Sequence, residues 1–261
     1  MKAAGRYRGS ARPILCSAYD TYDKRMTSYS TSFATNEDPL SEGGGRWKNG
    51  GTDGGGIWHD MAVAGNICYG KQNGPSFSDG TAILTGTWGP NQYVRTHVSV
   101  TGRYDAQFPE VEHRFRSVLN ATTNRGYEVT YSVAPANLYI DIVLWRGALG
   151  DFVILNEVDG LPCPVTGDLL ESFLIGTVIT TYLNGGLVLT YDTVSDLALH
   201  GAIWSDGNPG IGHNADPSDG TNNHLYGFTD FLASDLGGGV AVGDEGGWTL
   251  PRLYTRPPLF A

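Results

Sequence analysis

Four consecutive alternating runs between residues 92 and 145 constrain the fold more than any other part of the chain. They span residues 92–102, 110–117, 125–133 and 137–145, and each has β-branched or other apolar residues at every second position. Such alternation is typical of strands with one buried face. Because turn-like residues without helical spacing separate the runs, the sequence predicts that all four pair in one antiparallel sheet.

The two faces of this predicted sheet differ in chemistry. One face is apolar and should lie against the core, with His113 on it as a hydrogen-bonded core residue. The other face carries ionisable side chains, so it is either half-solvated or a binding surface. Its charged residues are Arg95, His97, Glu110, Glu112, Arg114, Arg116, Glu128 and Asp141.

Further short strand candidates on both sides of these runs indicate an all-β protein with one domain. The Asn184-Gly185 pair between alternating apolar runs predicts a tight hairpin. Residues 169–176 fit a strand or a helical turn. Residues 205–224 are polar and read as a long loop, and such loops inside compact domains often carry function.

The charge of the chain is unevenly distributed. It has 27 acidic and 17 basic residues, a formal net charge of −10, so a sequence-independent interaction with nucleic acid is not expected. Residues 1–28 hold six basic and two acidic residues, a net +4, which leaves −14 for the remainder. This basic segment is either a solvated tail or an arm that docks on an acidic neighbour, including a second copy of the chain.

The cysteine count and the hydrophobic runs limit the cellular context. The three cysteines, Cys16, Cys68 and Cys163, form no CxxC pair, which argues against a zinc site or disulfide scaffold and favours isolated thiols, although one bridge stays open. No signal peptide is visible, and no run approaches the ~18 apolar residues of a membrane helix. We therefore expect no membrane insertion.

Several short motifs occur in an order that resembles the concanavalin A-like lectin and glucanase superfamily, including its laminin G-like branch. They are Phe33, the run Asp38-Pro39-Leu40, Trp47, the pair of segments 113–117 and 125–129, the hairpin 176–192, the Gly-Asn-Pro-Gly-Ile-Gly turn 207–212 and the strand 226–233. The resemblance covers roughly residues 29–235. It implies a two-sheet antiparallel jelly-roll sandwich, with a basic N-terminal arm (1–28) and a Gly/Pro-rich C-terminal arm (236–261).

The resemblance implies two kinds of catalytic site, and the sequence matches neither fully. Glycosidases of the superfamily use a strand of the form E-x-D-x-x-E, of which Glu157-Val158-Asp159 supplies only the first part. Lyases use an arginine, a histidine and a tyrosine on one sheet face, and a possible match is Arg95 and His97 with Glu112 and Arg114 on the next strand and Tyr139. No catalytic residue is assigned, and an ion-paired face explains the same pattern. The candidate ligand-binding residues are Arg95, His97, Glu112, Arg114, Glu128, Tyr139 and Asp141.

The long polar loop and several aromatic residues offer two further kinds of contact. Relatives of this fold bind Ca²⁺ near such loops, and the oxygen-bearing side chains of Asp206, Asn208, Asp216 and Asp219 suit that ion, although Asp and Asn also favour turns. Aromatic residues can stack on sugar rings; the candidates are Trp58, Trp88, Tyr93, Trp145 and Trp204.

Three functions fit these observations. The first is a non-catalytic structural and binding module of a phage or virus particle, capsid decoration or tail-associated, which contacts neighbouring subunits or its own copies through the terminal arms and can bind surface glycans. The second is a glycan-cleaving enzyme, either a polysaccharide lyase or a glycoside hydrolase. The third is a lectin or adhesion domain of a larger extracellular protein. The expected location is the virion or the extracellular space.

Overall fold

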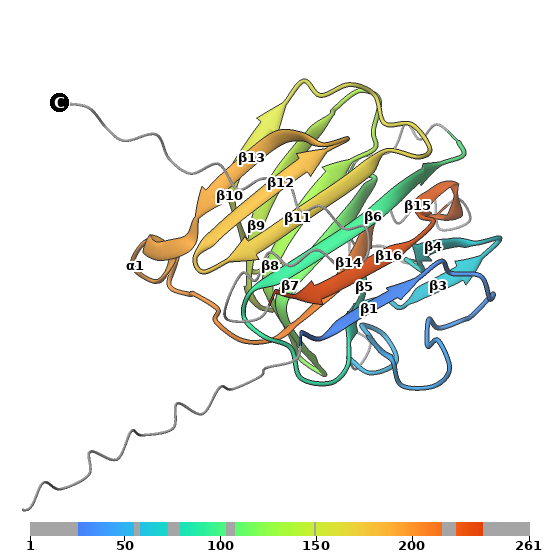
Figure 1. The fold of residues 1–261 in the computed structure, drawn as a ribbon, viewed down its shortest axis with the longest axis horizontal. Coiled ribbons are helices and arrows are strands. Elements are labelled where there is room, and N and C mark those ends of the chain that lie inside the picture. The colour runs from blue at the N-terminus through green and yellow to red at the C-terminus, as the bar shows by residue number, and fades with distance from the viewer. Residues whose placement is uncertain are drawn as a thin grey trace, which may run out of the picture.

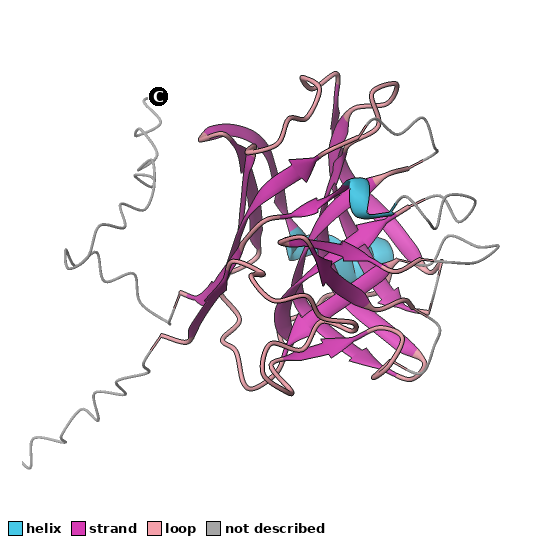
Figure 2. Cartoon of the chain, turned by 90° about the vertical axis from the view of Figure 1, so that its right-hand side faces the viewer, coloured by secondary structure: helices cyan, strands magenta, loops and turns pink. Residues whose placement is uncertain are grey.

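The computed structural model describes residues 26–54, 58–72, 79–102, 108–148, 150–215 and 223–236. Over these residues the chain forms two antiparallel sheets packed face to face, and Figure 2 shows the two layers of strands. The prediction of an all-β, two-sheet antiparallel jelly-roll sandwich is confirmed. Apart from residues 26–28 and 236, the two predicted arms lie outside the described residues.

The larger sheet has nine strands within the described part of the chain. Its order is β13-β12-β11-β6-β15-β4-β3, and β16 also pairs with β6 and carries β1 on its other side (Figure 1). The strands are β1 (Ser28–Thr31), β3 (Met61–Ala64), β4 (Ile67–Gly70), β6 (Gln92–Val100), β11 (Leu169–Ile175), β12 (Val178–Leu183), β13 (Gly186–Asp192), β15 (Tyr226–Phe228) and β16 (Phe231–Asp235).

The second sheet has seven described strands in the order β10-β9-β8-β7-β14-β5-β2. They are β2 (Trp47–Asn49), β5 (Gly80–Leu84), β7 (Glu110–Asn120), β8 (Thr123–Ser132), β9 (Tyr139–Gly147), β10 (Phe152–Asp159) and β14 (Asn208–Asn214). Short helical segments connect some of the strands. They are η1 (Thr193–Ser195) and α1 (Asp196–His200) between β13 and β14, and η3 (Asn223–Leu225) between β14 and β15.

The core lies between the sheets and contains the apolar positions of the alternating runs. Val94 of β6, Val111 of β7 and Val129 of β8 are all fully buried in it. Trp47 from the glycine-rich segment is 3% exposed and fills the same core, as its isolation among glycines predicts. Burial of such side chains stabilises the sandwich by roughly 1.5–3 kcal/mol each.

His113 joins the two sheets inside this core, which confirms the prediction of a hydrogen-bonded core histidine. Its Nε2 lies 2.9 Å from the Thr96 hydroxyl on β6, and its Nδ1 lies 3.1 Å from the Ser172 hydroxyl on β11. Burial disfavours the charged imidazolium and lowers the pKa of His113 to about 3. The histidine is therefore neutral at physiological pH and acts as a structural bridge.

The prediction that the four central runs form one sheet is wrong. Strand β6 pairs with β11, β15 and β16 in the nine-stranded sheet, whereas β7, β8 and β9 pair with one another in the seven-stranded sheet. The chain crosses between the layers after β6. Both kinds of strand show the same alternation because each has one face on the shared core.

The prediction of a polar loop over residues 205–224 is also wrong for residues 208–214. These residues form β14, which lies between β7 and β5, so the predicted turn at 207–212 is mostly strand. The glycines explain the difference: a Cβ on Gly212 would overlap Glu112 Oε2, and a Cβ on Gly210 would overlap the Ala82 carbonyl oxygen. Glycine here permits close approach within a sheet instead of marking a turn.

The segment 169–176 and the predicted hairpin resolve as strands. Residues 169–175 form β11, which excludes the helical alternative. Asn184 and Gly185 connect β12 to β13 with φ values of 52° and 77°, so the predicted tight hairpin is confirmed. Cys68 is buried and Cys163 is exposed, and both are unpaired, while Cys16 lies outside the described residues.

Arg116 connects several segments at one end of the sandwich. It sits in the irregular part of β7 with a φ of 45°. Its guanidinium donates to the carbonyl oxygens of Pro90 (2.8 Å), Trp204 (2.8 Å) and Gly176 (2.6 Å), and its backbone N–H donates to Gln92 Oε1 (2.8 Å). The donors of the Arg116 guanidinium are thus directed to peptide carbonyl groups and not to the carboxylates of the predicted charged face.

Candidate functional site

The outer face of the seven-stranded sheet, opposite the core, carries a buried cluster of ionisable side chains. Glu110, Glu112 and Arg114 alternate along β7 with the core residues Val111 and His113. The strand register brings β8, β9 and β14 beside them. Arg114 pairs with Glu128 of β8, and Thr130, which pairs with Glu112, faces Asp141 of β9.

Arg114 lies at the centre of this cluster. Its Nη2 is 3.2 Å from Asp79 Oδ2 and also contacts Glu112, and its Nη1 contacts Glu128. The side chains of Arg114 and Glu112 are each 1% exposed. The sequence-based grouping of Glu112, Arg114 and Glu128 matches this arrangement, whereas Asp79 was missed because it precedes β5, far away in the sequence.

Burial and charge shift the pKa values in opposite directions for the acids and the arginine. Burial raises the pKa of Asp79 to about 7 and that of Glu112 well above its usual range, although Arg114 opposes both shifts. Burial disfavours the charged guanidinium, but the surrounding carboxylates outweigh it and raise the pKa of Arg114. The arginine therefore stays charged while some of its acidic neighbours hold protons at neutral pH.

A second group of side chains extends the cluster along the sheet. Glu110 accepts hydrogen bonds from the Tyr139 hydroxyl and, at 2.7 Å, from Asn214 Nδ2. Asp141 is 4% exposed, and its Oδ1 has no hydrogen-bond partner. Burial, reinforced by the charge of Glu128, raises the pKa of Asp141 to about 8. The structure thus brings the predicted Tyr139 and Asp141 to the same face as Arg114.

This cluster contains carboxyl groups whose pKa values burial raises, and general acid–base catalysis uses carboxyl groups of this kind. Oxygens of Asp79, Glu112 and Glu128 lie within 4.8 Å of one another, a spacing that could also hold a metal ion. The Arg114 guanidinium, however, contacts all three carboxylates. The acidic residues of the cluster are also only 1–8% exposed, so the network around Arg114 is closed to the solvent.

An apolar strip lies on the same face beside the charged cluster. It consists of Trp58, Ile83, Leu119, Val143 and Trp145, which pack against one another. Trp145 connects the strip to the cluster, because its Nε1 donates to Glu128 Oε2 at 2.6 Å. The exposed ring of Phe152 on β10 continues the strip toward the sheet edge, with 5.0 Å between its centroid and that of Trp145.

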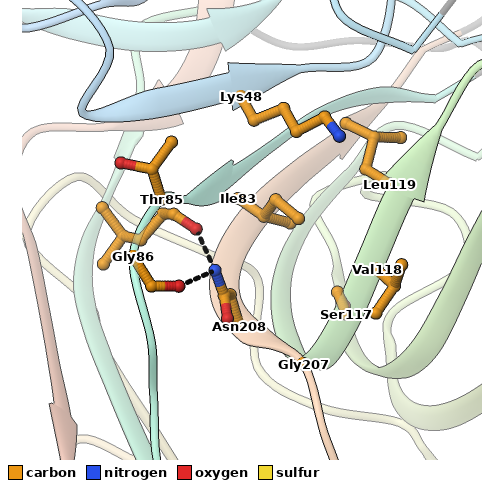
Figure 3. A pocket seen from close by; sticks show the side chains of 10 residues that line it. Lys48, Ile83, Thr85, Gly86, Ser117, Val118, Leu119, Gly207 and Asn208 are labelled. Atoms are coloured by element: carbon orange, nitrogen blue, oxygen red, sulfur yellow. Dashed lines mark hydrogen bonds between the residues drawn. The ribbon is translucent and has the colours of Figure 1, made fainter.

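A pocket of about 300 Å³ opens at the other end of this strip (Figure 3). Ile83 and Leu119 belong to both the strip and the pocket. Asn208 Nδ2 donates to the carbonyl oxygens of Leu84 (2.6 Å) and Gly86 (3.1 Å), which fixes one wall. The lining residues are Lys48, Ile83, Leu84, Thr85, Gly86, Ser117, Val118, Leu119, Gly207 and Asn208. No sequence motif marks this pocket, since its walls come from four distant strands.

The predicted ligand residues Arg95 and His97 are not part of this face. Both belong to β6, so the core separates them from Glu112 and Arg114. His97 Nδ1 lies 2.7 Å from Asp230 Oδ2, and Arg95 stands opposite Glu171 of β11. The proposed lyase grouping of Arg95 and His97 with residues of β7 is therefore wrong, for the same reason as the single-sheet prediction.

Two of the predicted calcium ligands have protein partners. Asp206 forms an ion pair with Arg125 at 3.1 Å and its side chain is 73% exposed. Asn208 Nδ2 is bonded to the two carbonyl groups of the pocket wall. Asp216 and Asp219 lie outside the described residues, so calcium binding there stays a prediction.

The aromatic candidates divide between the two sheets. Trp58 and Trp145 lie in the apolar strip, and their rings meet edge to face with centroids 4.8 Å apart. Trp88 and Trp204 are partly buried against the core, and Tyr93 stacks on Phe173 in the nine-stranded sheet. Only the first two therefore belong to the strip that shares Ile83 and Leu119 with the pocket, and neither lines the pocket itself. Within the described residues no helix is long and apolar enough to span a membrane.

No protein-family model matches the sequence, and no curated protein matches it. Solved structures match at 12% sequence identity. For β-agarase A from Zobellia galactanivorans the TM-score is 0.50, and the match covers 80% of this chain and 93% of the agarase. For β-agarase A in complex with oligoagarose the TM-score is 0.50, with coverage of 81% and 94%.

A carbohydrate-binding module from Bacillus subtilis matches with 12% identity and a TM-score of 0.47, over 73% of this chain and 92% of the module. The agarases have the concanavalin A-like jelly-roll fold. The chain has this fold as well, so the predicted resemblance is confirmed at the level of architecture. This fold hosts many activities, so the fold alone does not define the function of the chain.

Proposed function

We propose that this protein binds a glycan on the outer face of the seven-stranded sheet without cleaving it. The pocket supplies one partly exposed apolar side chain, Val118, beside the buried Ile83 and Leu119, and the CH face of a sugar ring can pack there. The fold shared with β-agarase A, one structure of which contains oligoagarose, supports a saccharide as the ligand. This proposal keeps the binding role predicted from the sequence and assigns it to a defined surface.

One observation carries the distinction between binding and cleavage. The carboxyl groups that could act on a glycosidic bond are 1–8% exposed, and three of them contact Arg114. A hydrolase needs an acid and a base that both reach the bond. The pocket, by contrast, lies open on the same face. A sugar can therefore occupy the pocket while the acidic cluster keeps its internal partners.

A pair of matched substitutions tests the binding site. Val118→Trp places a large ring in the pocket, whereas Val165→Trp makes the same change at a position that is 59% exposed and does not line it. Calorimetric titration with oligosaccharides should show at least a roughly tenfold loss of affinity for Val118→Trp and little change for Val165→Trp. Equal binding by both variants would remove the pocket from the proposal.

Glycan cleavage is the second candidate function, favoured by the raised pKa values of Asp79 and Asp141. Incubation of the wild-type protein with a polysaccharide panel should release no reducing ends and no unsaturated uronates. Release that is abolished by Glu112→Gln, with pocket binding retained, would establish the enzymatic function instead.

The role in a virus particle and the role as an adhesion domain remain predictions from the sequence. The role in a virus particle depends on contacts made by the terminal arms, which lie almost entirely outside the described residues. If the basic arm docks on another subunit, sedimentation of the chain without residues 1–25 should show a smaller assembly than the full chain. If the truncated chain and the full chain form assemblies with the same number of subunits, the result would count against that role.

A further inference from the structure

We infer that the pocket selects glycans with an anionic substituent, a carboxylate or a sulfate ester, and that Lys48 is its ion partner. This inference rests on the proposed glycan binding and adds the class of ligand. Lys48 is on β2 beside Ile83 of β5, and both side chains line the pocket. Figure 3 shows the Lys48 side chain extending over the pocket toward Leu119.

Among the residues that the structure describes, the ammonium of Lys48 has no counter-ion. Among the eight lysines and arginines that the structure describes, the other seven interact with neighbouring groups. Lys71, Arg114, Arg125 and Arg146 form ion pairs, Arg116 bonds carbonyl groups, Arg46 lies over a tyrosine ring, and Arg95 also has a partner. Lys48 has none within the described residues, although its side chain is half-buried.

The pocket also differs in charge from the rest of the chain. The chain has 27 acidic residues and a net charge of −10, yet none of the described residues that line the pocket is Asp or Glu, and Lys48 is the one charged group among them. An anionic substituent would meet attraction here and repulsion over most of the remaining surface. The partly exposed Val118 and the buried Ile83 and Leu119 line the pocket together with Lys48, which gives it apolar walls for the sugar ring that bears the anion.

Three oligosaccharide probes test this selectivity by titration calorimetry: neutral oligoagarose, a sulfated galactan oligosaccharide and an oligogalacturonate. We expect at least one anionic probe to bind about tenfold more tightly than oligoagarose, with an advantage that rising salt removes. Comparison of the two anionic probes identifies the preferred group. Lys48→Met keeps the apolar stem and should abolish the advantage, whereas Lys48→Arg should retain most of it.

Lys71→Met is the matched control, because Lys71 is a surface lysine paired with Asp38 outside the pocket. It should change no affinity, and thermal unfolding should show that all three variants are folded. Equal affinities for neutral and anionic probes, or an equal loss for both in Lys48→Met, would overturn the assignment of Lys48 while leaving glycan binding intact. Failure of all three probes to bind would overturn the proposed function as well.

Discussion

The buried carboxyl group of Asp141 should make the protein less stable as the pH rises from about 4 to about 8. Burial raises the pKa of this group to about 8, from an ordinary value of 3.8. At low pH the carboxyl is protonated in both the folded and the unfolded chain. Between the two pKa values the unfolded chain releases its proton and the folded chain does not, so the free energy of unfolding decreases.

The magnitude follows from the size of the shift. Each pH unit within this window lowers the free energy of unfolding by about 1.4 kcal/mol, so the loss from Asp141 alone reaches about 4 kcal/mol at pH 7. Asp141→Asn removes the titration and keeps the shape of the side chain. The difference in unfolding free energy between the variant and the wild type should therefore increase by about 4 kcal/mol in favour of the variant from pH 4 to pH 7.

Urea unfolding at several pH values measures this difference, since the other titrating groups are common to both proteins. Asp159→Asn provides the control, because it removes a carboxyl from an exposed position on the neighbouring β10 and should give a much flatter profile. If the difference in unfolding free energy between Asp141→Asn and the wild type stays constant across the pH range, burial does not hold this carboxyl protonated.

Two further substitutions test the packing of the same cluster. Arg114→Met removes the guanidinium shared by three buried carboxyl groups and should lower the unfolding free energy by about 3–5 kcal/mol at neutral pH, and by less at pH values where those groups are protonated. Gly212→Ala directs a methyl group into Glu112 and should lower the unfolding free energy by roughly 1–3 kcal/mol. Gly186→Ala, at the hairpin end of β13, should lower it by less. Similar losses for the two variants in urea unfolding would contradict the close approach of Gly212 to Glu112.

Alternation along the chain identifies buried faces but not sheet membership. The apolar positions of β6, β7 and β8 were predicted correctly, because period-two spacing reports which side chains face the core. The same spacing cannot distinguish pairing with the next strand from a crossover to the opposite layer. For β6 the crossover prevails, since β11, β15 and β16 satisfy its backbone hydrogen bonds. The misplacement of Arg95 and His97 follows from this single ambiguity.

The candidate site was predictable where it comes from consecutive strands and not elsewhere. Glu112, Glu128 and Asp141 lie on β7, β8 and β9, which pair in chain order, so their proximity follows from the pattern. Asp79 and the pocket depend on β14 and β5, which reach β7 over long sequence separations. The glycines that allow β14 to fit there resemble turn residues in the sequence and concealed the strand.

The bonding of Arg116 has a consequence for how the sandwich responds to its surroundings. Its guanidinium is held by three peptide carbonyl groups from separate segments, without a carboxylate among these acceptors. Peptide dipoles neither titrate nor exchange for dissolved ions, so acid and salt leave these bonds in place. Conditions that alter the protonation of the Arg114 cluster should therefore loosen one face of the protein while this end of the sandwich stays closed.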